Sequence, residues 1–280
     1  MKMKNLKRIA AFSEGNTGGN PAGVMIGEEF PLDEDMQATA KEVGYSETCF
    51  LVPFEDGWRI RYFSPETEVP FCGHATIAAG AALGQRNVSG ACRLYLNDRQ
   101  IDIEIQHHVP DRISVALQSP ETWTRQAPKG YTEQVLRHFN FTTDHLDPLY
   151  PPMIAYGGSK HLVLVVKDMR VLQNAAYEFE PVRALMKEQG LATISVVYIE
   201  SLKRVCARNF FASGGVYEDA ATGAAAAALA GYLRDLDWGG ARSFEISQGV
   251  DMGYPSRIFV DYGETKGESV RVAGSTRFIV

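Results

Sequence analysis

Short alternations of apolar and polar side chains run through this chain, and most of them predict β-strands. Trp58–Phe63 is a clear example, because three of its apolar side chains alternate with two arginines, as in a strand with one buried face. Similar runs recur to the end of the chain, where Ser269–Val272 and Thr276–Val280 are the last two predicted strands. Helical patterns are fewer and include Leu32–Val43 and Pro181–Gly190, the second with proline at its first position and glycine at its end.

Two alanine-rich segments depart from this pattern, one in each half of the chain. They are Phe71–Leu83 and Glu218–Ala230, and each contains a glycine, Gly73 or Gly223, where a helix would begin. Small residues all round a helix indicate that neighbouring elements surround it closely. A curved mixed sheet wrapped round a central helix, made twice, satisfies that requirement. We therefore expect an α+β fold of two pseudo-repeated domains.

The interruption between the two halves predicts the domain boundary. Ser119–Gly130 is polar, contains two prolines and shows no apolar periodicity. We expect an N-terminal domain at residues 1–118, a linker at 119–130 and a C-terminal domain at 131–280.

Composition excludes several classes of protein. The 280 residues are 45% hydrophobic and 22% charged, as in ordinary globular proteins, which excludes a mostly disordered chain or a coiled coil. The net charge is −6 and no dense Lys/Arg cluster occurs, so a nucleic acid is not an expected partner. The run Ala224–Ala230 is far shorter than the roughly 20 residues of a membrane helix, and the basic start lacks the apolar run of a signal peptide. We expect a soluble cytoplasmic protein without membrane contact.

The cysteine pattern predicts free thiols and no metal. The four cysteines are Cys49, Cys72, Cys92 and Cys206. They form neither a CxxC motif nor a zinc-finger spacing with histidine. Cys72 stands just before a predicted helix N-terminus, a position that activates a thiol and would suit a racemase. A two-thiol mechanism is disfavoured, because the second half has alanines where a partner thiol would be expected.

The two glycine turns are candidates for anion binding. A helix N-terminus presents backbone N–H groups and a partial positive charge, and glycine lets a ligand approach the backbone. Gly73 and Gly223 could together hold a carboxylate, or they could simply permit tight turns into buried helices.

Three titratable residues accompany these turns. Glu47 lies between apolar residues where a helix gives way to a strand, so it is either an acid/base group at the edge of the core or an exposed turn residue. His74 would lie in a first helical turn, where the dipole opposes a positive charge; it is either a neutral hydrogen-bonding group of a site or a structural histidine. Asp219 precedes the second glycine and is a candidate helix cap.

Taken together, these residues resemble the phenazine-biosynthesis-like (PhzF-like) family, which has the diaminopimelate-epimerase fold. The resemblance covers nearly the whole chain. It rests on the runs Gly19–Val24, Ser46–Phe50, Phe63–Thr76, Glu218–Gly223, Gln248–Gly249 and Met252–Ser256.

The resemblance implies a site between two similar domains, with a last strand that can cross back to the first domain. It places the family's general acid/base on Glu47, its site histidine on His74 and its site aspartate on Asp219. The substrate-binding positions that it implies are Asn20, Gly73, Thr222 and Gly223. It also implies a homodimer.

The chain departs from the family pattern beside the second glycine. Ala220 and Ala224 stand where the family usually has proline and serine, and Tyr254 stands where it often has arginine. These changes alter the expected contacts with the substrate and leave the proton-transfer residue, Glu47, unchanged.

We therefore predict an isomerase that needs no cofactor and shifts a proton on a small carboxylate substrate. Glu47 would perform both proton transfers. One alternative is a racemase or epimerase that depends on Cys72. Another is a non-enzymatic binding protein that retains the fold, which Ala224 favours.

Overall fold

The computed structural model describes residues 6–109, 112–239 and 242–279, so the last residue of the predicted strand Thr276–Val280 lies outside the described residues. Contacts divide the chain into two compact units. Unit 1 is Met1–Gln118 with Ala273–Val280, and unit 2 is Ser119–Val272. Among the described helices, none combines enough length with enough apolar character to span a bilayer.

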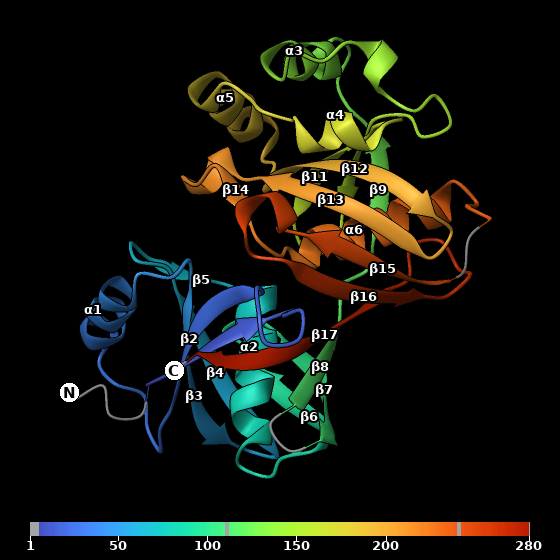
Figure 1. Cartoon of the computed structure of the whole chain (residues 1–280). Coiled ribbons are helices and arrows are strands. Elements are labelled where there is room, and N and C mark those ends of the chain that lie inside the picture. Colours follow the sequence, from blue (N-terminus) through green and yellow to red (C-terminus); the bar gives the residue numbers. More distant parts are fainter. Residues whose placement is uncertain (1–5, 110–111, 240–241, 280) are drawn as a thin grey trace. The chain divides into compact units, whose positions relative to one another are not determined.

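Unit 1 is a sheet rolled round the helix α2 (Figure 1). Its elements are β1 (Leu6–Ala11), β2 (Asn20–Ile26), α1 (Asp33–Val43), β3 (Thr48–Phe54), β4 (Gly57–Phe63), β5 (Glu68–Val69), α2 (Gly73–Gly84), β6 (Gly90–Tyr95), β7 (Gln100–Val109), β8 (Arg112–Gln118) and the C-terminal part of β17 (Val270–Ile279). Strands β1 to β4 pair in chain order, β4 also pairs with β6, and β6 to β8 pair in order. Because β17 pairs with both β1 and β8, the sheet closes on itself.

The interior of this closed sheet is filled by α2. Every residue from His74 to Gly84 is buried, as the small side chains predict. The glycines let strand β8 approach closely: a Cβ on Gly80 would lie 2.6 Å from Cγ1 of Val115, and one on Gly84 would lie 2.9 Å from Cδ1 of Ile113. Side chains larger than hydrogen at these two places would push the sheet away from the helix.

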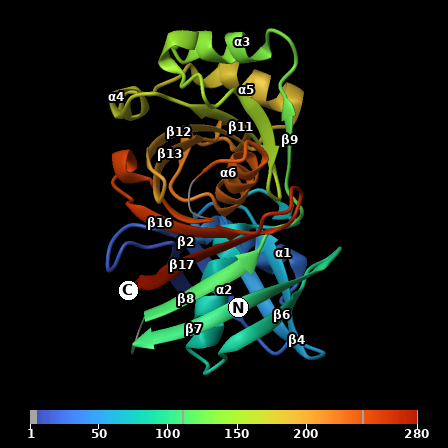
Figure 2. The same ribbon diagram turned by 90° about the vertical axis from the view of Figure 1, so that its right-hand side faces the viewer.

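Unit 2 repeats the arrangement, with strands round α6 (Figure 2). Its elements are β9 (Trp123–Gln126), α3 (Tyr131–His138), η1 (Thr143–His145), β10 (Met153–Tyr156), β11 (Lys160–Val165), α4 (Met169–Gln173), α5 (Phe179–Gln189), β12 (Thr193–Ser201), β13 (Arg204–Phe210), η2 (Ala212–Gly214), β14 (Glu218–Asp219), α6 (Gly223–Asp235), β15 (Ser243–Gln248), η3 (Val250–Met252) and β16 (Ser256–Tyr262). Pairing from β10 through β11, β12 and β13 to β15 is antiparallel, parallel, antiparallel and parallel. Pairing from β1 through β2, β3 and β4 to β6 follows the same order.

A repeated ion pair marks the same place in both units. The guanidinium of Arg61 donates two hydrogen bonds to the carboxylate of Glu68, at 2.8 and 2.7 Å. Arg208 donates in the same way to Glu218, at 3.1 and 2.6 Å. In each unit the arginine lies two residues before the end of a strand and the acid opens the next short strand. The predicted pseudo-repeat is therefore confirmed in backbone topology and in side-chain contacts.

The ion pairs also define a sequence alignment of the two alanine-rich segments. Gly73 lies five residues after Glu68, and Gly223 lies five residues after Glu218. The same alignment makes Thr222 the counterpart of Cys72. The residue of unit 2 that corresponds to Cys72 therefore carries a hydroxyl. It is neither a cysteine nor one of the alanines expected there.

The range expected to be a linker, 119–130, contains strand β9, and this part of the prediction needs correction. β9 pairs antiparallel with β10 inside unit 2. Trp123 stacks on Tyr156 across that pair, with ring centroids 5.2 Å apart and planes 3° apart. This cross-strand stack stabilises a strand that has no apolar alternation of its own.

Two other boundaries differ from the prediction. The runs Ser269–Val272 and Thr276–Val280 belong to one continuous strand, β17, with Gly274 inside it. A Cβ on Gly274 would lie 2.4 Å from a ring carbon of Phe12, so this glycine serves close packing and does not interrupt the strand. Helix α5 begins at Phe179, ahead of the predicted start at Pro181.

Candidate active site

Glu47 is held by backbone contacts at the start of β3. Helix α1 ends at Val43, and its C-cap residue Gly44, with a left-handed backbone (φ 71°), turns the chain towards β3. The carbonyl of Glu47 accepts a 3.2 Å hydrogen bond from the N–H of Gly23 on the parallel strand β2. Gly23 has no room for a side chain, because a Cβ would lie 2.6 Å from Oγ1 of Thr48. This close approach of β2 and β3 fixes the backbone that carries Glu47.

His74, in the first turn of α2, meets the carboxylate of Glu47. Its Nε2 lies 3.3 Å from Oε2 of Glu47 and 3.3 Å from Oγ of Ser46. The two side chains are 8% and 16% exposed, so most of the pair is shielded from water while the carboxylate keeps some access to the surface. A shielded carboxylate beside an imidazole is suited to proton transfer.

Cys72 contacts the other nitrogen of the same ring. Its Sγ lies 3.3 Å from Nδ1 of His74. A neutral ring that donates from Nε2 to Glu47 can accept from the thiol at Nδ1. Thiol, imidazole and carboxylate then form one continuous chain of polar groups.

Two buried hydroxyls secure the backbone before His74. The hydroxyl of Thr76 donates to the carbonyl of Cys72 at 2.7 Å, so it accepts from the hydroxyl of Tyr62, also at 2.7 Å. Burial raises the pKa of Tyr62 well above its usual value, and this phenol therefore keeps its proton. The contact holds the turn between Cys72 and His74 in one conformation.

The other three thiols are poor candidates for chemistry. Burial raises the pKa of Cys49, Cys92 and Cys206, so these thiols stay protonated near neutral pH. Cys49 donates instead to the backbone carbonyl of Ala75. Cys72 is the thiol with an imidazole beside it.

Asp219 belongs to a polar cluster in unit 2. Its Oδ2 accepts a 2.6 Å hydrogen bond from the hydroxyl of Thr222. The amide of Gln248 donates to the backbone carbonyl of Asp219 at 2.8 Å and to Oγ1 of Thr222 at 3.1 Å. Thr222, and not Asp219 as expected, is the N-cap residue of α6, and the side chain of Thr222 makes no capping hydrogen bond. The cluster instead fixes the direction of the carboxylate.

The predicted anion-binding glycines occupy the first position of their helices. Gly73 begins α2 and Gly223 begins α6, after Cys72 and Thr222, both with extended backbones. Neither described N-cap residue caps its own helix through its side chain, a feature compatible with anion binding. Asn20, the remaining predicted residue, begins β2 and is 5% exposed.

The predicted residues thus form two groups. Glu47 and His74 meet in unit 1, and Asp219 and Thr222 meet in unit 2. Sequence reasoning missed the contacts of Ser46 and Gln248. Ser46 is the first residue of the family run Ser46–Phe50, but only its place next to Glu47 points to a contact in the site. Gln248 lies 26 residues beyond Thr222, a separation that no local pattern bridges.

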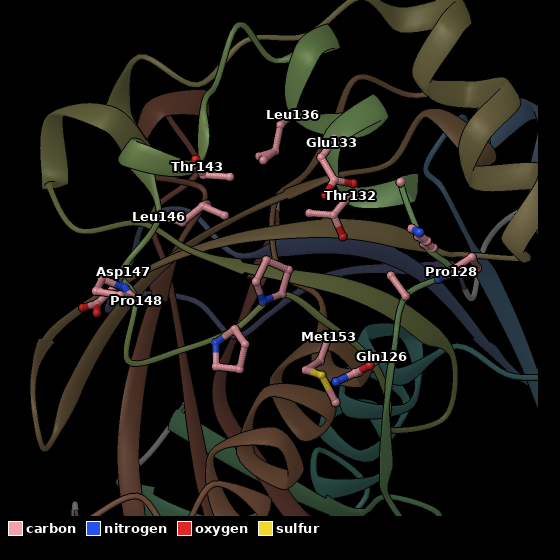
Figure 3. Close-up of a pocket in the computed structure, with 15 residues that line it drawn as sticks. Gln126, Pro128, Thr132, Glu133, Leu136, Thr143, Leu146, Asp147, Pro148 and Met153 are labelled. Atoms are coloured by element: carbon pink, nitrogen blue, oxygen red, sulfur yellow. The ribbon is translucent and has the colours of Figure 1, made fainter.

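Unit 2 also contains a pocket of about 550 Å³ (Figure 3). It lies beside α3, between the segment that leads into that helix and the segment that leads into β10. Leu136, Leu146 and Met153 supply apolar lining, and Glu133 and Asp147 supply carboxylates. None of the predicted site residues lines it.

Comparison with known proteins gives consistent matches over almost the whole chain. The model of the phenazine biosynthesis-like protein family matches residues 9–279. An uncharacterized isomerase of Deinococcus radiodurans is 29% identical over 290 residues, which cover 97% of this chain and 92% of that protein. The trans-2,3-dihydro-3-hydroxyanthranilate isomerase of Pseudomonas aeruginosa is 29% identical over 279 residues, which cover 95% of this chain and 91% of that enzyme.

A solved structure shows the same fold. The PhzF-family phenazine biosynthesis protein of Bacillus anthracis superposes with a TM-score of 0.85 at 22% identity, and the match covers 98% of this chain and 96% of that one. The fold expected from the resemblance is therefore confirmed. Because curated relatives of nearly full length are isomerases, this chain is an isomerase, and the non-enzymatic alternative is set aside. By the match over residues 9–279, the chain belongs to the phenazine biosynthesis-like protein family.

Proposed function

We propose that this isomerase shifts a proton on a small carboxylate substrate and that Glu47 is its acid/base. The observation that carries the proposal is the largely buried pair in which Oε2 of Glu47 lies 3.3 Å from Nε2 of His74. A carboxylate can take a proton from one carbon and return it to another without the help of a cofactor. The side chain of Glu47 is 16% exposed, so its carboxylate is not completely closed off from solvent.

His74 has two tasks in this proposal. A hydrogen bond from Nε2 orients the carboxylate of Glu47, and the ring can relay a proton between Glu47 and a neighbouring group. Loss of a proton from carbon leaves negative charge on the substrate, and fixed donors in a shielded site stabilise that charge. A positioned acid/base contributes about 10²–10⁴-fold, so such donors must supply the rest of the acceleration.

The proposed substrate class rests on the two helix N-termini. The first turns at Gly73 and Gly223 are proposed to bind a carboxylate through backbone N–H groups. Asn20 and Thr222 are proposed to contact the substrate, and Asp219 to orient it. The name of the Pseudomonas aeruginosa relative, an isomerase of a hydroxyanthranilate, supports a carboxylate. The predicted homodimer and cytoplasmic location complete this proposal.

A second candidate function uses Cys72 as the base of a racemase or epimerase. The 3.3 Å separation between its Sγ and Nδ1 of His74 favours it, because an imidazole can activate a thiol. The argument against this mechanism is that Thr222, the counterpart of Cys72 in unit 2, provides no second thiol. The glutamate mechanism needs no such partner and is therefore the stronger proposal.

Solvent deuterium exchange tests the proposal. The enzyme is incubated in D₂O with candidate amino and hydroxy carboxylates, and incorporation at carbon is followed by NMR. We expect exchange into a carboxylate, with most of the rate retained by Cys72→Ala. If Cys72→Ala abolishes exchange while Cys206→Ala does not, the racemase mechanism replaces the one proposed here.

A further inference from the structure

We propose that Glu47, Cys72 and His74 also bind a thiophilic divalent cation of the zinc class, and that the bound ion blocks the enzyme. Within the described ranges 6–109, 112–239 and 242–279, they are the one group of three cysteine, histidine or acidic residues whose ligand atoms converge. These atoms all lie within 4.8 Å of one another. No cysteine spacing predicts such a site, because Glu47 precedes β3 and is 25 residues away from Cys72 in the chain.

The geometry suits a tetrahedral ion. Bonds of about 2.0–2.3 Å from zinc to oxygen, nitrogen and sulfur place neighbouring ligand atoms about 3.3–3.6 Å apart. Nε2 of His74 lies 3.3 Å from Oε2 of Glu47 and 3.9 Å from Sγ of Cys72. The ligand atoms, all within 4.8 Å of one another, would have to move closer by rotation about the side-chain bonds of Cys72 and His74. The fourth ligand of a tetrahedral ion would be water.

The charges also suit such an ion. One thiolate and one carboxylate neutralise a divalent cation, so the complete site has no net charge. Neutrality is important here because Cys72 is 9% exposed and the side chains of His74 and Glu47 are 8% and 16% exposed. When the ion binds, the thiol releases its proton to solvent and the sulfur electron pair forms the bond to the metal. A thiolate–imidazole set favours zinc or cobalt over magnesium, which prefers oxygen ligands.

Inhibition follows from the same contacts. A carboxylate that ligates a metal cannot accept a proton from carbon, so the ion would compete with substrate. This consequence rests on the proposed function of Glu47, whereas the binding itself does not.

Cobalt titration of the full-length protein tests the site without any assay of activity. After treatment with a chelator, Co²⁺ is added and the near-ultraviolet thiolate-to-cobalt band is recorded. We expect the band to saturate at one ion per chain and to be bleached by Zn²⁺ but not by Mg²⁺. Cys72→Ser should lack the band, and the matched Cys206→Ser should keep it. His74→Ala should weaken Co²⁺ binding by at least ~10²-fold, because one of three ligands is lost.

Two results would overturn the proposal. One is the absence of a thiolate band in the wild-type protein at millimolar Co²⁺. The other is a band that survives in Cys72→Ser and disappears in Cys206→Ser. Circular dichroism of each variant confirms that the comparison is made between folded proteins. If the band behaves as expected but Zn²⁺ does not slow isomerisation, the metal site stands, whereas the proposed block of the enzyme and the role of Glu47 as acid/base are both wrong.

Discussion

Acid should destabilise unit 2 through His161. This histidine, on β11, is completely buried. Thr193 donates its hydroxyl proton to Oδ1 of Asn209 at 3.0 Å, so it accepts from Nδ1–H of His161 at 2.7 Å. The remaining ring nitrogen, Nε2, lies 2.9 Å from Oγ of Ser159 and accepts from it. The network fits a neutral ring and leaves no place for a second ring proton.

The size of the effect follows from the pKa. Burial lowers the pKa of His161 from 6.5 to about 3. Between these values the unfolded chain binds a proton that the folded chain does not, so stability is lost as the pH falls below about 6.5. Each pH unit in that window costs about 1.4 kcal/mol, and the loss from pH 7.0 to pH 4.5 is about 2.5 kcal/mol.

Urea unfolding at these two pH values measures the loss. The control variant is His161→Gln, which keeps a polar side chain but cannot titrate. It should be less stable than wild type at pH 7.0, because the ring contacts are gone. The difference in free energy of unfolding between the two proteins should shrink by about 2.5 kcal/mol at pH 4.5. A difference that stays constant across this range would show that His161 is not held neutral by burial.

Three further changes test packing and positioning. Gly80→Ala should destabilise the protein by about 1–2 kcal/mol in chemical denaturation, because a Cβ 2.6 Å from a side chain of β8 outweighs the gain in helix propensity. Thr222→Val removes the 2.6 Å hydrogen bond to Asp219, and turnover on the deuterium-exchange substrate should fall by about 10–100-fold, with little change in the unfolding midpoint. Arg208→Leu leaves the 4%-exposed carboxylate of Glu218 buried without its partner and should cost about 3–5 kcal/mol in the same denaturation measurement. Equal stability of wild type and Arg208→Leu would show that the repeated ion pair is not structural.

The architecture could be predicted because the alanine-rich helices have a single physical explanation. Residues as small as those of Phe71–Leu83 would leave cavities unless other elements packed closely all round them. The strand β9 could not be predicted in this way. Its polar run acquires a reason to be a strand only when Trp123 meets Tyr156, which is thirty-three residues away in the chain. The break predicted between the last two strands was wrong for a similar reason. Gly274, which lies in that break, packs against Phe12 from the opposite end of the sequence.

The candidate site was predictable where one segment carries the residues. Cys72 and His74 are two residues apart, so their contact is local. The meeting of Glu47 and His74 depends on how β3 packs against α2, and only the family resemblance gave it in advance. Gln248 belongs to the family run Gln248–Gly249, but its contact had no signal, because it is made with the distant Thr222.

Solvent deuterium exchange catalysed by the Glu47→Gln variant tests most directly the central claim, that Glu47 is the acid/base. The substitution keeps the shape of the side chain and removes its proton chemistry, and Glu42→Gln, at an exposed position of α1, is the matched control. On a substrate found by the deuterium screen, Glu47→Gln should bind almost normally and lose at least ~10²-fold in exchange rate. Glu42→Gln should exchange at the wild-type rate. A Glu47→Gln protein that also exchanges at the wild-type rate would contradict the assignment of Glu47 as the acid/base.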